Sequence, residues 1–164
     1  MYFILERKYR SNIDIVELLI KEGRTLKTMK CSSVAPCGLI CDLCYAFQRP
    51  KNRCKGCNSS GNKTSYCEKC RIKQCPEKAD EYELCNKCAK YPCLIIKNLD
   101  KRYSLKYGES AIANLDLIKE KGKRAFIMDQ KAEWKCPRCG NLLCVHKTAC
   151  QNCGHLRDMG RQVC

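Results

Sequence analysis

The sequence contains very few histidines: only His146 and His155 occur among its 164 residues. Histidine is the commonest general acid or base, and a catalytic zinc usually needs a histidine or carboxylate ligand beside an open coordination position. The chain also lacks a phosphate-binding loop, a dinucleotide-binding motif, paired carboxylates and a Ser-His-Asp pattern. These absences argue against the common enzyme classes and favour a protein that binds.

Long apolar runs are also missing. The apolar start Tyr2–Leu5 is followed at once by Glu6, Arg7 and Lys8, so it is too short for the hydrophobic region of a secretory signal. No run is long enough to span a bilayer. We therefore expect a cytoplasmic protein with no membrane contact, in a reducing compartment where thiols bind metal rather than form disulfides.

Aliphatic and aromatic residues are scarce in residues 31–94, where about one residue in four is apolar once cysteine is set aside. A segment of this length and composition buries too little apolar surface to offset its own ordering entropy. A structural zinc contributes about 10–16 kcal/mol of apparent binding energy in small finger peptides. We predict that bound metal holds this segment folded.

Cysteine, in contrast, is abundant, with 18 residues. Two residues between thiols allow both sulfurs to face one ion from a single tight turn, as tetrahedral sulfur ligation of zinc or iron requires. Six such Cys-x-x-Cys pairs occur: Cys41/Cys44, Cys54/Cys57, Cys67/Cys70, Cys85/Cys88, Cys136/Cys139 and Cys150/Cys153. The six remaining cysteines are Cys31, Cys37, Cys75, Cys93, Cys144 and Cys164.

The last two pairs form the strongest motif, Cys136-Pro137-Arg138-Cys139-Gly140 followed by Cys150-Gln151-Asn152-Cys153-Gly154. The glycine after each second cysteine lets the backbone curl so that amide N–H groups point at the thiolates. The segment resembles a zinc ribbon of the rubredoxin-like type. Zinc is favoured there, although the same four sulfurs also suit iron. Cys144, His146 and His155 are left as spare residues.

The other four pairs predict two four-sulfur sites in residues 31–94. Sequential pairing joins the first pair to the second and the third to the fourth, whereas an interleaved cross-brace joins alternate pairs. Shorter loops favour sequential pairing by only about 1 kcal/mol. Cys37, Cys75, Cys93 and Cys31 are left over; they substitute for pair members, form a third site, or pack as small apolar residues.

The spacing Cys37-x3-Cys41-x2-Cys44 is shared with radical-SAM enzymes, where three cysteines leave one iron of a cluster open. The chain has neither the length nor the strand pattern of their barrel, and Leu43 stands where those enzymes usually carry an aromatic residue. We therefore reject that enzyme class. An iron–sulfur cluster bound by these three cysteines, without such a barrel, stays an alternative.

Taken together, the motifs from Pro36-Cys37-Gly38 to Tyr91-Pro92-Cys93 resemble a cysteine-rich family, domain of unknown function three-seven-nine-five. The resemblance covers about residues 34–94. Longer members are similar to this chain in continuing into a helical segment and a terminal ribbon. The resemblance implies a small prokaryotic cytosolic protein, and it implies no particular activity.

Composition divides the chain into four segments: an extension with an amphipathic helix (1–30), a cysteine-rich module (31–94), a helical spacer (95–134) and the ribbon (135–164). Met29 is an alternative start of translation.

Short helices are expected near Leu39–Phe47 and Pro76–Tyr82. In the spacer we expect helices around Leu94–Tyr103, over Ser110–Lys121 and over Lys123–Glu133. The predicted fold class is a small, metal-stabilised α+β protein.

The formal charge of +15 is strongly basic. Four thiolates around one zinc carry a net charge of −2, so the expected total of about three zinc sites lowers it to +15 − 6 = +9. Anionic partners therefore remain favoured. Two clusters are candidate nucleic-acid contacts: Arg49, Lys51, Arg53 and Lys55, and Lys121, Lys123 and Arg124 beside Lys119.

The leading hypothesis is a non-enzymatic, multi-zinc binding protein that contacts RNA, the ribosome or another protein–RNA assembly. The alternative is an iron–sulfur protein for electron transfer or a component of a redox enzyme, with Cys37, Cys41 and Cys44 among its ligands. A third hypothesis is metal trafficking or sensing by the unpaired cysteines.

Overall fold

The computed structural model describes residues 29–78 and 83–157, and this part of the chain is mostly helical. The two long helices are α4 (Leu94–Tyr107) and α5 (Ala111–Glu133). The amphipathic helix predicted in the N-terminal extension lies outside the described residues. The short elements are η1 (Cys31–Ser33), η2 (Cys41–Leu43), α2 (Tyr45–Gln48), α3 (Ser65–Glu68), η3 (Pro76–Lys78) and η4 (Cys85–Lys87).

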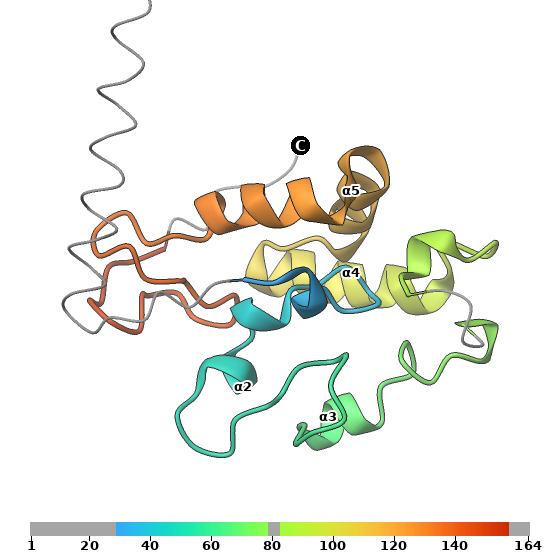
Figure 1. Ribbon diagram of the computed structural model, residues 1–164, viewed down its shortest axis with the longest axis horizontal. Coiled ribbons are helices and arrows are strands. Elements are labelled where there is room, and N and C mark those ends of the chain that lie inside the picture. The colour runs from blue at the N-terminus through green and yellow to red at the C-terminus, as the bar shows by residue number, and fades with distance from the viewer. Residues whose placement is uncertain (1–28, 79–82, 158–164) are drawn as a thin grey trace, which may run out of the picture.

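Helices α4 and α5 form a hairpin closed by a short polar turn (Figure 1). Gly108 ends α4 in the left-handed conformation (φ 65°), and Ser110 caps α5 by accepting a hydrogen bond from the Ala113 N–H. Asp100 joins the two helices, because its Oδ1 accepts bonds from the Ser110 hydroxyl (2.7 Å) and the Ile112 N–H (3.0 Å). The turn therefore fixes how α5 lies against α4.

A break at Gly122 divides α5 into two helical segments, because this residue has φ 81° and ψ 157°. Only glycine adopts such a conformation readily. The sequence predicted this break, with helices ending at Lys121 and beginning at Lys123, and the structure confirms it. The second segment buries Phe126 and Ile127.

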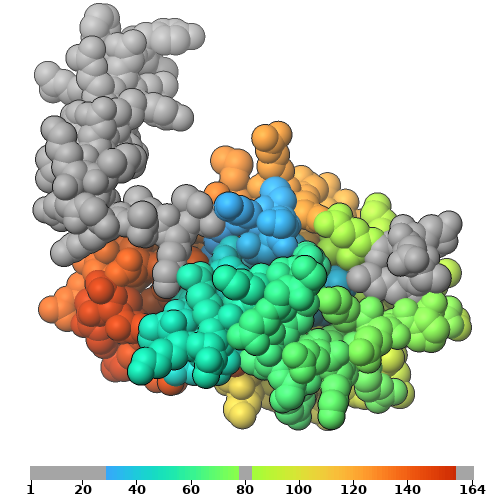
Figure 2. Space-filling model, turned by 60° about the horizontal axis from the view of Figure 1, so that its bottom comes forward, coloured from blue at the N-terminus to red at the C-terminus, as the bar shows by residue number. Residues whose placement is uncertain are grey.

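The cysteine-rich module consists of loops and single helical turns, as its glycine-, asparagine- and serine-rich sequence predicts. The short helix expected near Leu39–Phe47 corresponds to η2 and α2. The one expected near Pro76–Tyr82 is present as η3, although its last residues are not described. In Figure 2 the module spreads over one face of the molecule, with the ribbon at one end.

One hydrophobic core joins the module, α5 and the ribbon. Leu43 of the module, Leu115 and Phe126 of α5 are each at most 2% exposed. Each buried side chain of this kind stabilises the fold by about 1.5–3 kcal/mol. The core members are Met29, Val34, Ile40, Leu43, Leu84, Leu115, Ile118, Phe126, Ile127, Trp134, Cys136, Leu143, Val145 and Cys150.

Strand structure is slight in the described residues. It consists of three isolated antiparallel bridges: Val34↔Ile40 in the cysteine-rich module, and Lys135↔Leu142 and Ala149↔Leu156 in the ribbon. The small, cysteine-rich, helical character of the prediction is therefore present, whereas its β component is reduced to single bridges. No helix in the described part of the chain is both long and apolar enough to cross a bilayer.

Candidate metal centres

The ribbon contains two knuckles with the same backbone geometry. In each, the glycine after the second cysteine has a positive φ (73° at Gly140, 71° at Gly154) and donates its N–H to the carbonyl of the first cysteine, at 2.9 and 3.0 Å. The N–H of Cys136 donates to the Asn141 carbonyl, and that of Cys150 donates to the His155 carbonyl, both at 2.8 Å. This repeated turn directs the thiols of both pairs toward a common point.

The four ribbon thiols lie within 4.8 Å of one another. Sγ of Cys136 is 3.7 Å from Sγ of Cys153, and Sγ of Cys139 is 3.6 Å from Sγ of Cys150. Sulfurs placed about 2.3 Å from one tetrahedral zinc are about 3.8 Å apart. The spacing therefore fits one four-coordinate ion, with no further protein ligand needed.

The ribbon thiols do not titrate alike. A hydrogen bond from the Asn141 backbone lowers the pKa of Cys139 to about 6. A bond from the His155 backbone also lowers the pKa of Cys153, but burial and the three neighbouring thiols outweigh it and raise that pKa to about 12. Four thiols this close share protons, and a cation in their midst favours the thiolate form of all four.

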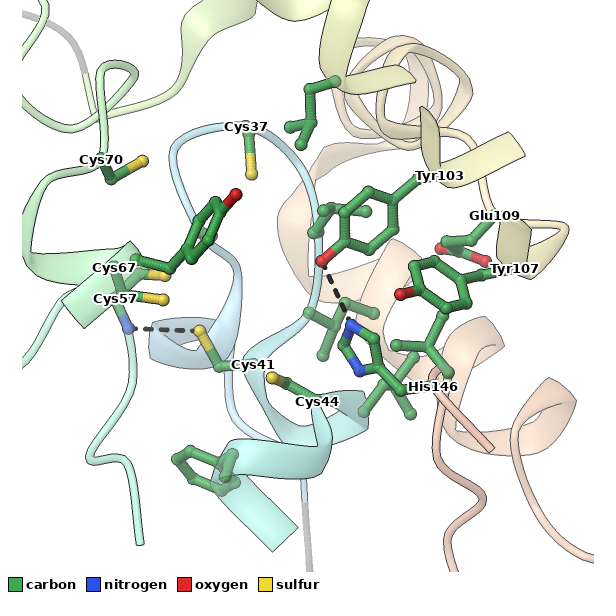
Figure 3. A pocket seen from close by; sticks show the side chains of 18 of the residues that line it. Cys37, Cys41, Cys44, Cys57, Cys67, Cys70, Tyr103, Tyr107, Glu109 and His146 are labelled. Carbon is green, nitrogen blue, oxygen red and sulfur yellow. Dashed lines mark hydrogen bonds between the residues drawn. The ribbon is translucent and has the colours of Figure 1, made fainter. Parts of the chain in front are cut away.

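A second group of thiols surrounds a cavity of about 540 Å³ between the cysteine-rich module and α4 (Figure 3). We call it the thiol cavity. Its opposite wall carries Tyr103, Tyr107, Glu109 and His146. Seven cysteines line it: Cys37, Cys41, Cys44, Cys54, Cys57, Cys67 and Cys70.

Backbone N–H groups already donate to two sulfurs of the thiol cavity. The Cys57 N–H donates to Sγ of Cys41 at 3.2 Å, and the Gly56 N–H donates to Sγ of Cys54 at 3.4 Å. Gly56 is buried with φ 97°, a conformation that suits glycine. Such donors stabilise the thiolate over the thiol. This turn therefore has the chemistry of a metal-thiolate knuckle.

Burial raises the pKa of several thiols around this cavity. It raises the pKa of Cys37 to about 12, and it also raises the pKa values of Cys44 and Cys67. The pKa of Cys57 rises mainly through its side-chain hydrogen bond with Cys41. Metal binding at such thiols must release protons, so affinity there falls as the pH falls.

The remaining cysteines of the module lie outside the lining of this cavity. Neither Cys85 nor Cys88 lines it, although both belonged to the second site that sequential pairing predicts. Cys93 precedes α4, Cys75 is half-buried and Cys31 is exposed. In the described residues, the ribbon is the only place where three or more ligand atoms lie within 4.8 Å of one another. The assignment of the module's cysteine pairs to particular ions therefore stays a prediction.

His146, which sequence analysis left as a spare residue, connects the ribbon to the wall of the thiol cavity. Its Nδ1 accepts a hydrogen bond from the Tyr45 N–H (3.3 Å), and its Nε2 lies 3.3 Å from the Tyr103 hydroxyl. Burial lowers the pKa of His146, with smaller contributions from Lys106 and Arg157. A neutral ring with its proton on Nε2 satisfies both bonds. No sequence signal pointed to Tyr103 or Glu109.

The basic residues predicted to contact nucleic acid lie in different settings. Arg49 donates to the Asn52 carbonyl, and the Arg53 guanidinium lies 4.8 Å from the centre of the Phe47 ring. Lys121 and Lys123 form ion pairs with Asp129 and Glu83. Exposed side chains among the predicted set are Lys51, Arg53, Lys55, Lys121 and Arg124.

The described structure is thus that of a small, cysteine-rich protein with one four-thiol site suited to a metal ion. Residues 33–98 match the family described as Protein of unknown function (DUF3795), which agrees with the resemblance seen in the module. The match ends before α5 and the ribbon. No curated protein and no solved structure matches the chain.

Proposed function

We propose that this protein is a non-enzymatic, multi-zinc binding protein that contacts RNA or a protein–RNA assembly. One observation carries the metal-binding part, namely the four ribbon thiols gathered within 4.8 Å on two knuckles. All four ligands are thiols, and two of them, Cys136 and Cys150, are buried. A closed four-thiolate site of this kind serves structure, since catalytic zinc keeps an open position.

The RNA-binding part is supported by charge and by cations beside aromatic rings. The formal charge is +15. The Lys147 ammonium lies 4.6 Å from the centre of the Tyr45 ring, which is 40% exposed. The Arg53 guanidinium lies over Phe47 in the same way. Basic grooves with aromatic platforms are the usual means of binding single-stranded nucleic acid.

The test is a gel shift with bulk single-stranded RNA over a range of salt concentrations. We expect binding that weakens with salt, and a triple variant K51Q/R53Q/K55Q whose salt slope is lower by about 2, because each phosphate that a cation neutralises adds about 0.7 to the slope. The control K121Q/K123Q removes two cations already paired with carboxylates, so its slope changes by less than the about 1.4 that two lost phosphate contacts would give. Wild-type protein without salt-sensitive binding overturns the RNA proposal.

A second candidate function, an iron–sulfur protein for electron transfer or a redox-enzyme component, is favoured by the thiol cavity. Its seven thiols include Cys37, Cys41 and Cys44, the three expected to ligate a cluster. Metal analysis and an absorption spectrum on protein purified without oxygen separate the two. Colourless protein with zinc supports the first function, whereas iron, sulfide and absorbance at about 400 nm support the second.

A further inference from the structure

We propose that the thiol cavity holds one polynuclear metal-thiolate centre, of two or more thiophilic ions, shared by the first three Cys-x-x-Cys pairs and Cys37. The proposal rests on the metal-binding part of the proposed function and is independent of RNA binding. It differs from the expectation of two separate four-sulfur sites, because three pairs converge on one space while the fourth pair lies outside it.

The first argument for a polynuclear centre is the spacing of the sulfurs. In the ribbon two sulfur pairs are 3.6 and 3.7 Å apart, and all four sulfurs lie within 4.8 Å of one another, which suits a single ion. Around the thiol cavity, no three ligand atoms of the described chain lie within 4.8 Å of one another. Thiols that surround a space without meeting at one point suit a group larger than one ion.

The second argument is the number of thiols that line the cavity. Two closed tetrahedral ions need eight ligand positions. The cavity offers seven thiols and no eighth from the fourth pair. Seven thiols fill eight positions when one sulfur bridges both ions, and inorganic sulfide bridges iron in the same way. A shared sulfur makes the ions one centre instead of two independent sites.

On the opposite wall, the two side chains of the usual metal-ligand types, His146 and Glu109, already make hydrogen bonds. Both ring nitrogens of His146 are engaged, Nδ1 with the Tyr45 N–H and Nε2 with the Tyr103 hydroxyl. The carboxylate of Glu109 accepts a 2.7 Å bond from the Asn114 side chain. The ligands therefore come from the thiol side, which selects soft ions such as zinc, copper(I) or iron with sulfide.

The backbone joins the first two pairs into one unit. The 3.2 Å bond from the Cys57 N–H to Sγ of Cys41 crosses from the second pair to the first. Hydrogen bonds that orient ligands and tune their basicity are typical of the surroundings of metal sites. Because the bond links the first pair to the second, loss of one of these pairs disturbs the ligands of the other.

The test counts ions in the full chain by native mass spectrometry, after purification without oxygen. We expect C54S, which removes a buried thiol of the cavity, to lose two or more ions together and to keep the ribbon ion. The matched control C31S removes an exposed thiol outside the cavity and keeps all ions. If C54S loses one ion or none, the proposal is wrong.

A second measurement on wild-type protein needs no variant to fold. X-ray absorption at the metal edge shows a metal–metal scattering shell for a polynuclear centre, and the absence of that shell overturns the proposal. The edge and the sulfide content distinguish zinc from iron. If wild-type protein lacks the ribbon ion as well as the cavity ions, the proposed metal-binding function fails. If wild-type protein has the ribbon ion but one ion or none in the cavity, only this inference is rejected.

Discussion

The backbone N–H of Val145 donates a hydrogen bond of 2.8 Å to the carbonyl oxygen of Leu43, joining the ribbon to the cysteine-rich module. Both side chains are at most 5% exposed and belong to one core. The ribbon is therefore not an appendage on a flexible spacer. A metal bound by its thiols also supports the backbone against which the module packs.

Gln48 gives the first prediction, because it makes contacts on both sides of this junction. Its Nε2 donates to the carbonyls of Asp42 (2.7 Å) and Leu143 (2.9 Å), and its Oε1 accepts a bond from Gln151. We expect Gln48→Ala to lower the free energy of unfolding by about 1–3 kcal/mol, because two carbonyls lose a partner. Denaturant unfolding of the metal-loaded protein measures this.

The matched control for Gln48 is Gln74→Ala. Gln74 is exposed and its side chain donates to the carbonyl of nearby Glu68, so its loss is expected to cost less than about 0.5 kcal/mol. Equal losses in the two variants contradict the role given to Gln48.

Gly38 gives the second prediction, since the module packs closely against α5 there. A Cβ on Gly38 comes within 2.7 Å of Leu115 Cγ and 2.8 Å of the Ala111 carbonyl oxygen, and φ is +85°. We expect Gly38→Ala to cost about 2–5 kcal/mol, from about 1–2 of backbone strain plus about 1–3 of overpacking. Gly154→Ala has positive φ but no neighbour within 4 Å, so strain alone applies. Thermal unfolding of both variants tests the steric part, and equal costs contradict it.

Local sequence signals predicted the helices well. Ser110 and Gly122 marked the start of α5 and its break because capping and positive φ depend on one residue at a time. The ribbon thiols were predictable for the same reason, since each knuckle is a local turn. Trp134, just before the ribbon, is buried, and its Nε1 donates to Gln130.

The thiol cavity was not predictable, because it depends on which loops meet. Loop-closure entropy separated the pairing schemes by only about 1 kcal/mol, far less than the packing terms that decide the arrangement. The third pair lines the cavity with the first, and α4 supplies Tyr103 as part of the wall. Contacts between residues so distant in sequence leave no periodic pattern in either segment.

Metal removal gives the third prediction. The module buries few aliphatic residues, and its helices are single turns. We expect a chelator to unfold residues 31–94, seen as collapse of their dispersed amide resonances in an NMR spectrum. Restoring zinc should restore the dispersion, which serves as the control for irreversible oxidation. Retained dispersion in a metal-free sample contradicts a metal-dependent fold.

Glu109 gives the last prediction. Burial raises its pKa to about 7, although the Asn114 hydrogen bond lowers it; Glu133 raises it further and Arg157 lowers it. The pKa of Glu109 in the folded protein lies above its ordinary value of 4.5, so the protonated group favours the folded state. This stabilisation is complete below pH 4.5 and is lost as the pH rises through about 7. Between about pH 6 and about pH 8.5 the contribution of Glu109 to the free energy of unfolding falls by about 1 kcal/mol.

Glu109→Gln keeps an oxygen that can accept the Asn114 bond but cannot ionise. Its free energy of unfolding relative to wild type should therefore rise by about 1 kcal/mol from about pH 6 to about pH 8.5, where thiolate-bound metal is retained. Glu120→Gln, which removes an exposed carboxylate from α5, is the matched control. If the free energies of unfolding of wild type and Glu109→Gln depend on pH in the same way, the Glu109 carboxyl ionises normally. Its burial beside Asn114 would then have no energetic cost.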